Sequence, residues 1–441
     1  MTTKLDRFFR LTERHTSVRT EILAGVTTFL TMAYIVLVNP AILGLAGMPV
    51  AAVAAATCFA AGVASILMGA TANVPLALAP GMGLNAYFAF TVVQQMHVPW
   101  PTALGCVFIS GCVFLVLTLV GVRRMIVNAI PPHLYAAVAG GIGLFIAFIG
   151  LRNAGIVVSN ADTSVALGDL KSLPAALALI GLVLIVGLNA WRVKGAVLIG
   201  ILATTALGWL IGIVDFKPQP YSLAALSQTA FALDIRGAFN LRGGGLLAVV
   251  EIVFVFLFVD LFDNIGTLVA VTKRAGLTTP DGEIPGLNRI LLADAAATVI
   301  GSMAGTSTVT SYVESAAGVQ AGGRTGLTAI VTGLLFLATM AAAPYAQAIP
   351  LAATAPALIL VGALMMAPLA EIDWEDPLYA LPAFLTLVMI PLTFSIANGL
   401  AFGVTAYAAL KIIRRQVARR DWLLFLLAAL FGVRFIYMSA V

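Results

Sequence analysis

Charged residues are scarce in this chain. Asp, Glu, Lys and Arg together make up 10% of its 441 residues, whereas apolar residues make up 61%. Soluble domains carry about 25% charged residues, so the composition excludes an ordinary soluble protein. Apolar stretches of roughly 17 to 25 residues, the length that a helix needs to cross a bilayer, recur along nearly the whole sequence. We therefore predict an all-α integral membrane protein surrounded by the lipid bilayer.

Cysteine and histidine are rare as well, with three residues of each. Cys58, Cys106 and Cys112 lie inside apolar stretches without the spacing of a metal site, and we interpret them as small packing residues. The histidines fall in the N-terminal tail, in a loop and at a helix start, where surface or capping roles are expected. The sequence thus predicts no disulfide, no metal site and no cofactor, and it shows no convergent set of catalytic groups typical of an enzyme.

The net charge of +5 comes from basic residues in short loops beside the apolar stretches. This placement is typical of membrane topology and argues against a nucleic-acid partner. Residues 1–19 lack the apolar core and the cleavage site of a secretory signal. With the N-terminus in the cytoplasm, most of the 24 Lys and Arg residues fall on the inner side. We therefore predict a multi-pass protein of the cell (inner) membrane with both termini cytoplasmic.

The apolar stretches, separated by Gly, Pro and charged residues, predict fourteen membrane spans. They lie at 21–38, 50–70, 76–94, 101–120, 133–151, 173–190, 195–214, 245–271, 288–303, 305–320, 324–345, 353–370, 376–396 and 398–413.

A polar segment at 215–244 divides these spans into two sets of seven. An odd number of spans inverts the second half relative to the membrane, as in inverted-repeat transporters. We predict a first seven-span repeat at 1–214, an external connecting segment at 215–244 and a second, inverted repeat at 245–413. Residues 414–441 are interpreted as a cytoplasmic basic segment followed by an apolar helix at 422–438. That helix lies at the membrane interface or, as an alternative, forms a fifteenth span.

Two spans in matching positions of the halves differ from ordinary helices. The third, PLALAPGMGLNAYFAFTVV, places Pro80, Gly81 and Gly83 at bilayer depth, and the tenth, GTSTVTSYVESAAGV, begins with Thr, Ser and Val residues that favour extended backbone. Irregular backbone at this depth is tolerated only where protein or a wet cavity satisfies its polar groups. We predict a short strand followed by a half-helix in each span, with the two facing one another across a central site.

The eighth span, 245–271, carries two aspartates within the apolar run VDLFDNIGTL. An acid at a helix centre costs roughly 2.5–3.5 kcal/mol on insertion, far more than one apolar residue returns. At 100° per residue, Asp260, Asp263, Asn264 and Thr267 share one stripe, which predicts a polar face lining a cavity. The alternative for either aspartate is a hydrogen bond to a neighbouring helix, as buried polar residues often make.

Glu314 and Asn85 are the candidate polar groups of the half-helices. Glu314 follows the first turn of the tenth-span half-helix, close to free backbone N–H groups, and Asn85 carries an amide that both donates and accepts. Two buried acids facing one cavity are costly to ionise together, so Asp263 or Glu314 is expected to carry a proton during part of the cycle. Glu251 is interpreted as structural or exposed at the rim, and Asp294 as either a backbone partner or a proton carrier.

Four motifs give the chain a resemblance to a known family. They are TTFLTMAYIVLVNPAIL at 27–43, LAPGMGLNAYFAFTVV at 78–93, FVDLFDNIGTL at 258–268 and GTSTVTSYVESAAGVQAGGRTGLTA at 305–329. Nearly end to end, the chain resembles the adenine, guanine and hypoxanthine permeases (AzgA-like purine permeases), a branch of the nucleobase/ascorbate transporter superfamily. The resemblance implies two inverted seven-span repeats arranged as a core domain (spans 1–4 and 8–11) and a gate domain (spans 5–7 and 12–14).

The resemblance also implies a substrate site between the third, eighth and tenth spans. In that superfamily an acid on the eighth span and an acid on the tenth form hydrogen bonds with the base, and these positions match Asp263 and Glu314. The Tyr-x-Glu pattern of the tenth span begins here at Tyr312, and Asn85 matches the third-span position that purine permeases use. Uracil-transporting relatives carry a histidine where this chain has Thr267, so their proton relay is not carried over. These five residues are the substrate-binding candidates.

The residues and the resemblance together predict a secondary active transporter that imports adenine, guanine or hypoxanthine by proton symport through alternating access. Asp263, Glu314 and Asp260 are the candidate proton-coupling groups. Another planar base, such as uracil or xanthine, is the alternative substrate. An ion channel or anion exchanger on the same scaffold is the alternative class, although buried acids without a facing buried cation argue against anions. A homodimer is plausible by resemblance. Candidates for stacking on the base are Phe262, Tyr87 and Phe88.

Overall fold

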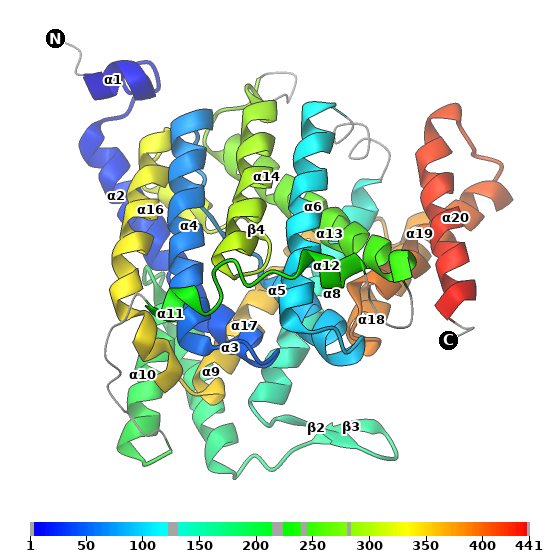
Figure 1. The fold of residues 1–441 in the computed structure, drawn as a ribbon, viewed down its shortest axis with the longest axis horizontal. Helices are drawn as coiled ribbons and strands as arrows, with labels where there is room; N and C mark the ends of the chain where they lie inside the picture. Colours follow the sequence, from blue (N-terminus) through cyan, green and yellow to red (C-terminus); the bar gives the residue numbers. More distant parts are fainter. Residues whose placement is uncertain (1–3, 122–130, 214–223, 240–244, 280–283, 439–441) are drawn as a thin grey trace. The chain divides into compact units, whose positions relative to one another are not determined.

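The computed structural model describes residues 4–121, 131–213, 224–239, 245–279 and 284–438 (Figure 1). The described chain is mostly helical, with two short two-stranded sheets. Within these residues, ten helices are long and apolar enough to cross a membrane, and three shorter apolar helices accompany them. The prediction of a helical membrane protein is confirmed.

The first of two compact units comprises Met1–Leu119 and Gly150–Leu358. Its elements are α1 (Lys4–Phe9), α2 (Val18–Met32), α3 (Ile35–Gly44), α4 (Val50–Ala72), β1 (Leu78–Pro80), α5 (Met82–Ala86), a π-helix (Tyr87–Gln95), α6 (Trp100–Leu119), β2 (Val157–Asn160), β3 (Ser164–Leu167), α9 (Leu173–Ala190), α10 (Ala196–Leu210), α11 (Ala224–Ser227), α12 (Ile235–Phe239), α13 (Gly245–Arg274), α14 (Leu287–Ala304), β4 (Val309–Ser311), α15 (Ser315–Gln320), α16 (Gly326–Thr339), a 3-10 helix (Met340–Ala348) and most of α17 (Leu351–Leu364).

The second unit comprises Val120–Ile149 and Ile359–Val441. Its elements are α8 (Pro132–Asn153), which continues into the first unit, the 3-10 helices Ala367–Glu371 and Arg419–Asp421, α18 (Pro377–Leu392), α19 (Ile396–Ile413) and α20 (Trp422–Met438). An ion pair of 2.7 Å joins Arg414 to Asp376, beside the N-terminus of α18. The ring of His133, for which a surface or capping role was predicted, packs against Tyr379 with 4.2 Å between centroids.

The first membrane span is a broken helix. Ser17 begins α2 as its N-cap, because its side chain accepts a hydrogen bond from the Thr20 N–H. The helix ends at Met32, and α3 begins at Ile35. The break contains Tyr34, whose side chain is buried. The sequence predicts one uninterrupted span at 21–38, so the interruption is a finding of the structure.

The third and tenth spans contain the predicted strands. β1 and β4 pair antiparallel. Backbone bonds extend the ladder at both ends, since the Gly81 N–H donates to the Thr308 carbonyl (2.9 Å) and the Tyr312 N–H donates to the Ala77 carbonyl (3.0 Å). α5 and the π-helix follow β1, and α15 follows β4. The prediction of a strand and a half-helix in each of these spans is confirmed.

A hydroxyl from a neighbouring helix holds each strand. Ser65 of α4 donates to the Leu78 carbonyl (3.1 Å) and accepts from the Leu78 N–H (2.9 Å). Thr298 of α14 donates to the Val309 carbonyl (3.0 Å). Because a bilayer supplies no water to unpaired backbone groups, these bonds stabilise extended chain at membrane depth.

Close contact between α4 and α16 depends on glycine. A Cβ added to Gly326 would lie 1.9 Å from the Gly69 carbonyl oxygen. Small residues allow two helix backbones to touch, which is the usual way that helices associate in a bilayer. A larger side chain at Gly326 would therefore force these two helices apart.

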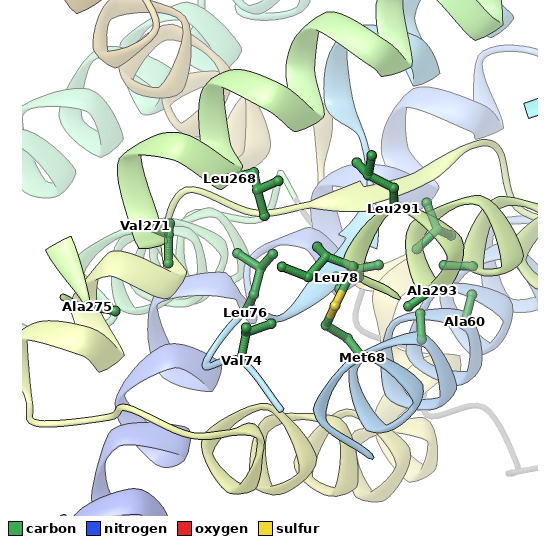
Figure 2. Packing of buried hydrophobic residues seen from close by; sticks show 14 of the residues in the cluster. Ala60, Met68, Val74, Leu76, Leu78, Leu268, Val271, Ala275, Leu291 and Ala293 are labelled. Atoms are coloured by element: carbon green, nitrogen blue, oxygen red, sulfur yellow. The ribbon is translucent and has the colours of Figure 1, made fainter. Parts of the chain in front are cut away.

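An apolar cluster packs β1 against three helices (Figure 2). It includes Met68 of α4, Leu76 and Leu78 at β1, Leu268 of α13 and Leu291 of α14, all buried. These contacts fix the start of the half-helix relative to the helix that carries the two aspartates.

Most predicted spans agree with helix bounds to within a few residues. The predicted spans at 195–214 and 376–396 correspond to the shorter helices α10 and α18, which fall below the length of the ten long spans. The count of fourteen and the inverted repeat stay predictions. Residues 215–223 and 240–244 of the predicted connecting segment lie outside the described residues, and the remainder includes α11 and α12.

Candidate functional site

The polar face of α13 is buried within the first unit. Asp260 and Asn264 are 2% and 0% exposed, and Thr267 is 9% exposed. Asp263 Oδ2 lies 3.7 Å from the position that a Cβ on Gly81 would occupy. The Asp263 carboxylate therefore reaches the point where β1 gives way to α5. The helical spacing that predicted one polar stripe places these side chains on the inward face of α13.

Thr310 of β4 reaches the same point from the other strand. It lies opposite Ala79 in the ladder, and its methyl Cγ2 is 3.0 Å from the same Cβ position on Gly81. Asp263, Gly81 and Thr310 thus converge from α13, the end of β1 and β4. A side chain at position 81 would enter this space, so glycine keeps the three elements close together.

Glu314 immediately precedes α15 and is half-buried. Its Oε1 accepts a hydrogen bond of 2.5 Å from the hydroxyl of Tyr34. α13, which carries Asp263, packs against α15, which Glu314 immediately precedes, so the two predicted acids lie on elements that are in contact. Asp294 is fully buried.

Tyr312 connects two segments, β1 with α5 and β4 with α15, which meet where β1 and β4 pair and are called the crossing segments below. Its hydroxyl donates to the Pro80 carbonyl at 2.6 Å, and its backbone N–H is used by the Ala77 carbonyl. The sequence analysis expects free backbone N–H groups close to Glu314, and the N–H of Tyr312, two residues before it, is already bonded. Tyr312 therefore braces the strand crossing, and its contact with substrate stays a prediction.

Asn85 is fully buried in a network of amides and hydroxyls. Its Nδ2 donates to Asn39 Oδ1 at 2.5 Å, and its Oδ1 accepts from the Ser307 hydroxyl. Asn39 in turn donates to Thr57 (2.7 Å) and Thr306 (3.0 Å). An asparagine amide has two N–H donors, so one N–H of Asn85 is left over from these bonds. A substrate contact of Asn85 stays a prediction, limited to that donor and the second lone pair of Oδ1.

Several buried polar groups near the crossing make no hydrogen bond within the described residues. These are both side-chain atoms of Asn264 and the hydroxyls of Thr308, Thr310 and Ser311. A buried polar group without a partner costs about 1–3 kcal/mol. α13 packs directly against β4, so the unsatisfied groups lie on two elements in contact. A polar ligand or ordered water at this place would compensate the cost.

The sequence reasoning missed three buried partners, Tyr34, Asn39 and Glu21. Glu21 of α2 is fully buried and accepts from the backbone N–H groups of Arg324 (2.9 Å) and Thr325 (3.2 Å), so it caps the start of α16. All three lie in or near the motif region of the first span, and a lone polar residue in an apolar stretch was the available signal.

The Phe262 side chain, a stacking candidate, lies outside the described residues, while Tyr87 packs edge-on against Phe256 with 5.1 Å between centroids.

Metal ligation has no support in the described part of the chain. No group of three or more His, Cys, Asp or Glu residues there could hold an ion. Cys58 and Cys106 are buried, and Cys112 is partly buried.

Over most of its length, the sequence is similar to proteins named as permeases. The model of the Permease family matches residues 19–402. The chain is 48% identical to a putative permease of Methanocaldococcus jannaschii over 436 residues, which cover 99% of both chains. It is 43% identical to the adenine permease AdeP of Escherichia coli, covering 99% of this chain and 97% of the relative. It is 44% identical to the guanine/hypoxanthine permease PbuG of Bacillus subtilis, covering 98% and 99%.

Two solved structures with a similar fold are those of anion transporters. The transmembrane domain of the cyanobacterial bicarbonate transporter BicA has a TM-score of 0.66 and 18% identity, covering 88% of this chain and 97% of that one. The murine anion transporter Slc26a9 in an inward-facing state has a TM-score of 0.64 and 14% identity, covering 91% and 69%. At these identities the likeness concerns the fold alone.

Proposed function

The chain belongs to the Permease family, and from this premise we propose that it imports purine nucleobases (adenine, guanine and hypoxanthine) by proton symport. Family membership makes it a membrane transporter and not an enzyme. The substrate class is supported by full-length similarity to proteins named adenine permease and guanine/hypoxanthine permease.

The observation that carries the proposal is the set of hydrogen-bonding groups at the strand crossing. Asp263 and Glu314 offer carboxylate oxygens as acceptors, and Asn264 offers a fully buried amide that is unbonded within the described residues. A purine base presents N–H donors and ring acceptors along the edge of one flat molecule. Such an edge complements acids and an amide, which together supply acceptors and donors.

Electrostatic repulsion between the acids supports proton coupling. Asp263 lies on α13 and Glu314 immediately precedes α15, and these two helices pack against each other, so charges on both acids would repel. A proton on one acid relieves that repulsion and turns an acceptor into a donor. We place coupling at Asp263 or Glu314, with Asp260 as the third candidate. Binding of base and proton to the same few groups would then make their transport obligatory together.

The architecture proposed for transport is the one implied by the resemblance. Fourteen spans form two inverted seven-span repeats, at 1–214 and 245–413, joined by an external segment. Spans 1–4 and 8–11 form the core domain, and spans 5–7 and 12–14 form the gate domain. Rocking of one domain against the other alternates access to the site. Both termini lie in the cytoplasm, and a homodimer forms through the gate domain.

An anion substrate is the rival suggested by the similar folds. The site described here carries acids, which repel anions, and the acid Glu314 stands at the start of α15, where an anion would otherwise bind. A neutral base with N–H donors fits these charges better. Uracil or xanthine is the closer rival, because it presents the same kinds of groups.

Reconstitution into proteoliposomes tests the proposal. Uptake of labelled adenine, guanine and hypoxanthine is measured with and without an inward proton gradient, and a protonophore is then added. We expect saturable uptake of at least one purine that depends on the gradient and collapses with the protonophore. Uptake unaffected by the gradient would refute symport. Stronger competition by uracil, xanthine or bicarbonate than by any of these purines would refute the substrate assignment.

A further inference from the structure

Tyr34 lies outside the predicted site, and its side chain makes a hydrogen bond to the predicted site acid Glu314. It lies in the break between α2 and α3, is 1% exposed, and donates its hydroxyl to Glu314 Oε1 at 2.5 Å. The two residues are 280 positions apart in the chain. The bond therefore joins the break in the first span to the acid of the tenth span.

Close packing of α2 against α15 keeps this geometry fixed. A Cβ added to Gly318 of α15 would lie 2.0 Å from Thr28 Oγ1 and 2.8 Å from the Ala24 carbonyl oxygen. The two helices therefore touch through backbone and small side chains, one turn or more from Tyr34 and Glu314. Neither helix can shift far without losing that contact, so the phenol and the carboxyl face each other in a defined orientation.

A carboxylate can accept hydrogen bonds at both oxygens, whereas a tyrosine hydroxyl supplies one donor. When Tyr34 bonds Oε1, rotation of the carboxyl group is restricted and Oε2 acquires a fixed direction. A phenol that donates to this acid also favours its acceptor form over a form that donates its own proton to Tyr34.

We propose that Tyr34 is a positioning residue for substrate selection: it holds Glu314 through Oε1 so that Oε2 accepts from one ring N–H of the transported base. This inference rests on the proposed function. Tyr34 does not contact the base in this scheme but acts through Glu314. Its removal therefore weakens the recognition of that N–H more than it weakens binding in general.

The first arm of the test needs no substrate. Infrared difference spectra of the purified full-length protein in lipid identify the Glu314 carboxyl band as the one lost in Glu314→Gln. In Tyr34→Phe this band is expected to shift, because its hydrogen-bond donor is gone. The matched control is Tyr407→Phe, a buried tyrosine of α19 in the second unit, which leaves the band in place. An unshifted band in Tyr34→Phe would overturn the inference.

The second arm uses hypoxanthine and its isomers methylated at single ring nitrogens as competitors of labelled uptake. For Tyr34→Phe we expect the KM for hypoxanthine to rise on the order of tenfold, with Vmax little changed. The methyl isomer that the wild type rejects most strongly already lacks the N–H, so its inhibition constant stays nearly the same. Equal weakening of both ligands would show a merely structural role and overturn the inference.

The two arms separate the possible failures. Wild-type vesicles that take up no purine overturn the proposed function, whereas the infrared arm still decides whether Tyr34 holds Glu314. If Tyr34→Phe does not fold, Tyr34→Met replaces it in both arms, because methionine fills apolar space flexibly and also lacks the hydroxyl. The expected shift and the expected loss of discrimination are then the same.

Discussion

The two crossing segments, β1 with α5 and β4 with α15, share an outline and differ in chemistry. In the first, Ser65 satisfies the backbone of Leu78, and the Asn85 amide is held on both sides by Asn39 and Ser307. In the second, the buried hydroxyls of Thr308, Thr310 and Ser311 have no bond within the described residues, and an acid, Glu314, follows directly.

This difference suggests a division of labour between the segments. A segment whose polar groups are bonded by neighbouring elements is a rigid frame, because any movement would break bonds that a bilayer cannot replace. In a segment with unsatisfied polar groups, each buried group that nothing else bonds costs about 1–3 kcal/mol of stability. We infer that the first segment positions the site and that the second segment, with Asp263 of α13, binds the substrate through hydrogen bonds.

The largest expected effect comes from the acid of the second segment. Glu314→Gln keeps the size of the side chain but removes its charge and its ability to exchange a proton. We expect purine uptake to fall on the order of 100-fold or more, since bonds to a charged group are worth about 1.5–3 kcal/mol and coupling is lost as well. Radiolabel uptake normalised to protein in the membrane measures this.

The matched control is Glu371→Gln, which changes an exposed glutamate of the second unit. It should transport like the wild type. Normal uptake by Glu314→Gln would show that the acid of the second segment is not needed for substrate binding. It would contradict the proposed difference between the two segments.

The next largest effect concerns the stability of the first segment. Asn39→Ala removes the acceptor of Asn85 and the donor to Thr57 and Thr306. Leaving such partners buried and unpaired costs about 1–3 kcal/mol. We expect a clearly lower Tm in detergent, with the KM of the remaining folded protein nearly unchanged. A large rise in KM without a change in Tm would instead assign Asn39 and Asn85 to substrate binding.

The sequence predicted the features that follow from local residue pattern and from the free-energy cost of placing acids in an apolar run. Gly and Pro at bilayer depth, and a run of Thr and Ser, predicted the strands of both crossing segments. Asp263 and Glu314 stood out because acids are expensive in an apolar run. The partners of these acids were not predictable from periodicity. Tyr34 and Glu314 are 280 residues apart, and only the folded arrangement of the first and tenth spans brings them together.

The structure of the first half-helix was also beyond the local pattern. The sequence predicted a half-helix after Gly81, and the structure shows an α-helical start followed by a π-helix at Tyr87–Gln95. A π-helix has wider hydrogen-bonded turns and often marks functional sites. Its formation depends on what packs around it, such as Phe256 against Tyr87, and hydropathy does not encode those contacts.

A matched pair of hydroxyl deletions gives the next, smaller effect. Thr310→Val removes a hydroxyl that has no bond within the described residues, whereas Ser65→Ala removes one that holds the Leu78 backbone. We expect Thr310→Val to raise the KM roughly fivefold while Tm stays the same, and Ser65→Ala to lower stability by about 1 kcal/mol while KM stays the same. Uptake kinetics and thermal unfolding in detergent measure both variants. Reversed outcomes would exchange the roles of the two segments.

The smallest expected effect concerns Tyr312, which joins the two segments. Tyr312→Phe keeps the ring and removes the 2.6 Å bond to the Pro80 carbonyl. The net loss is about 0.5–1.5 kcal/mol, so we expect a small drop in Tm and a similar KM for all purines. If Tyr312 contacts the base, as the sequence suggested, the KM will instead rise for some purines more than for others. Measuring the KM of Tyr312→Phe for adenine, guanine and hypoxanthine therefore distinguishes two roles of Tyr312. It either holds the two segments together by a hydrogen bond or contacts the base directly.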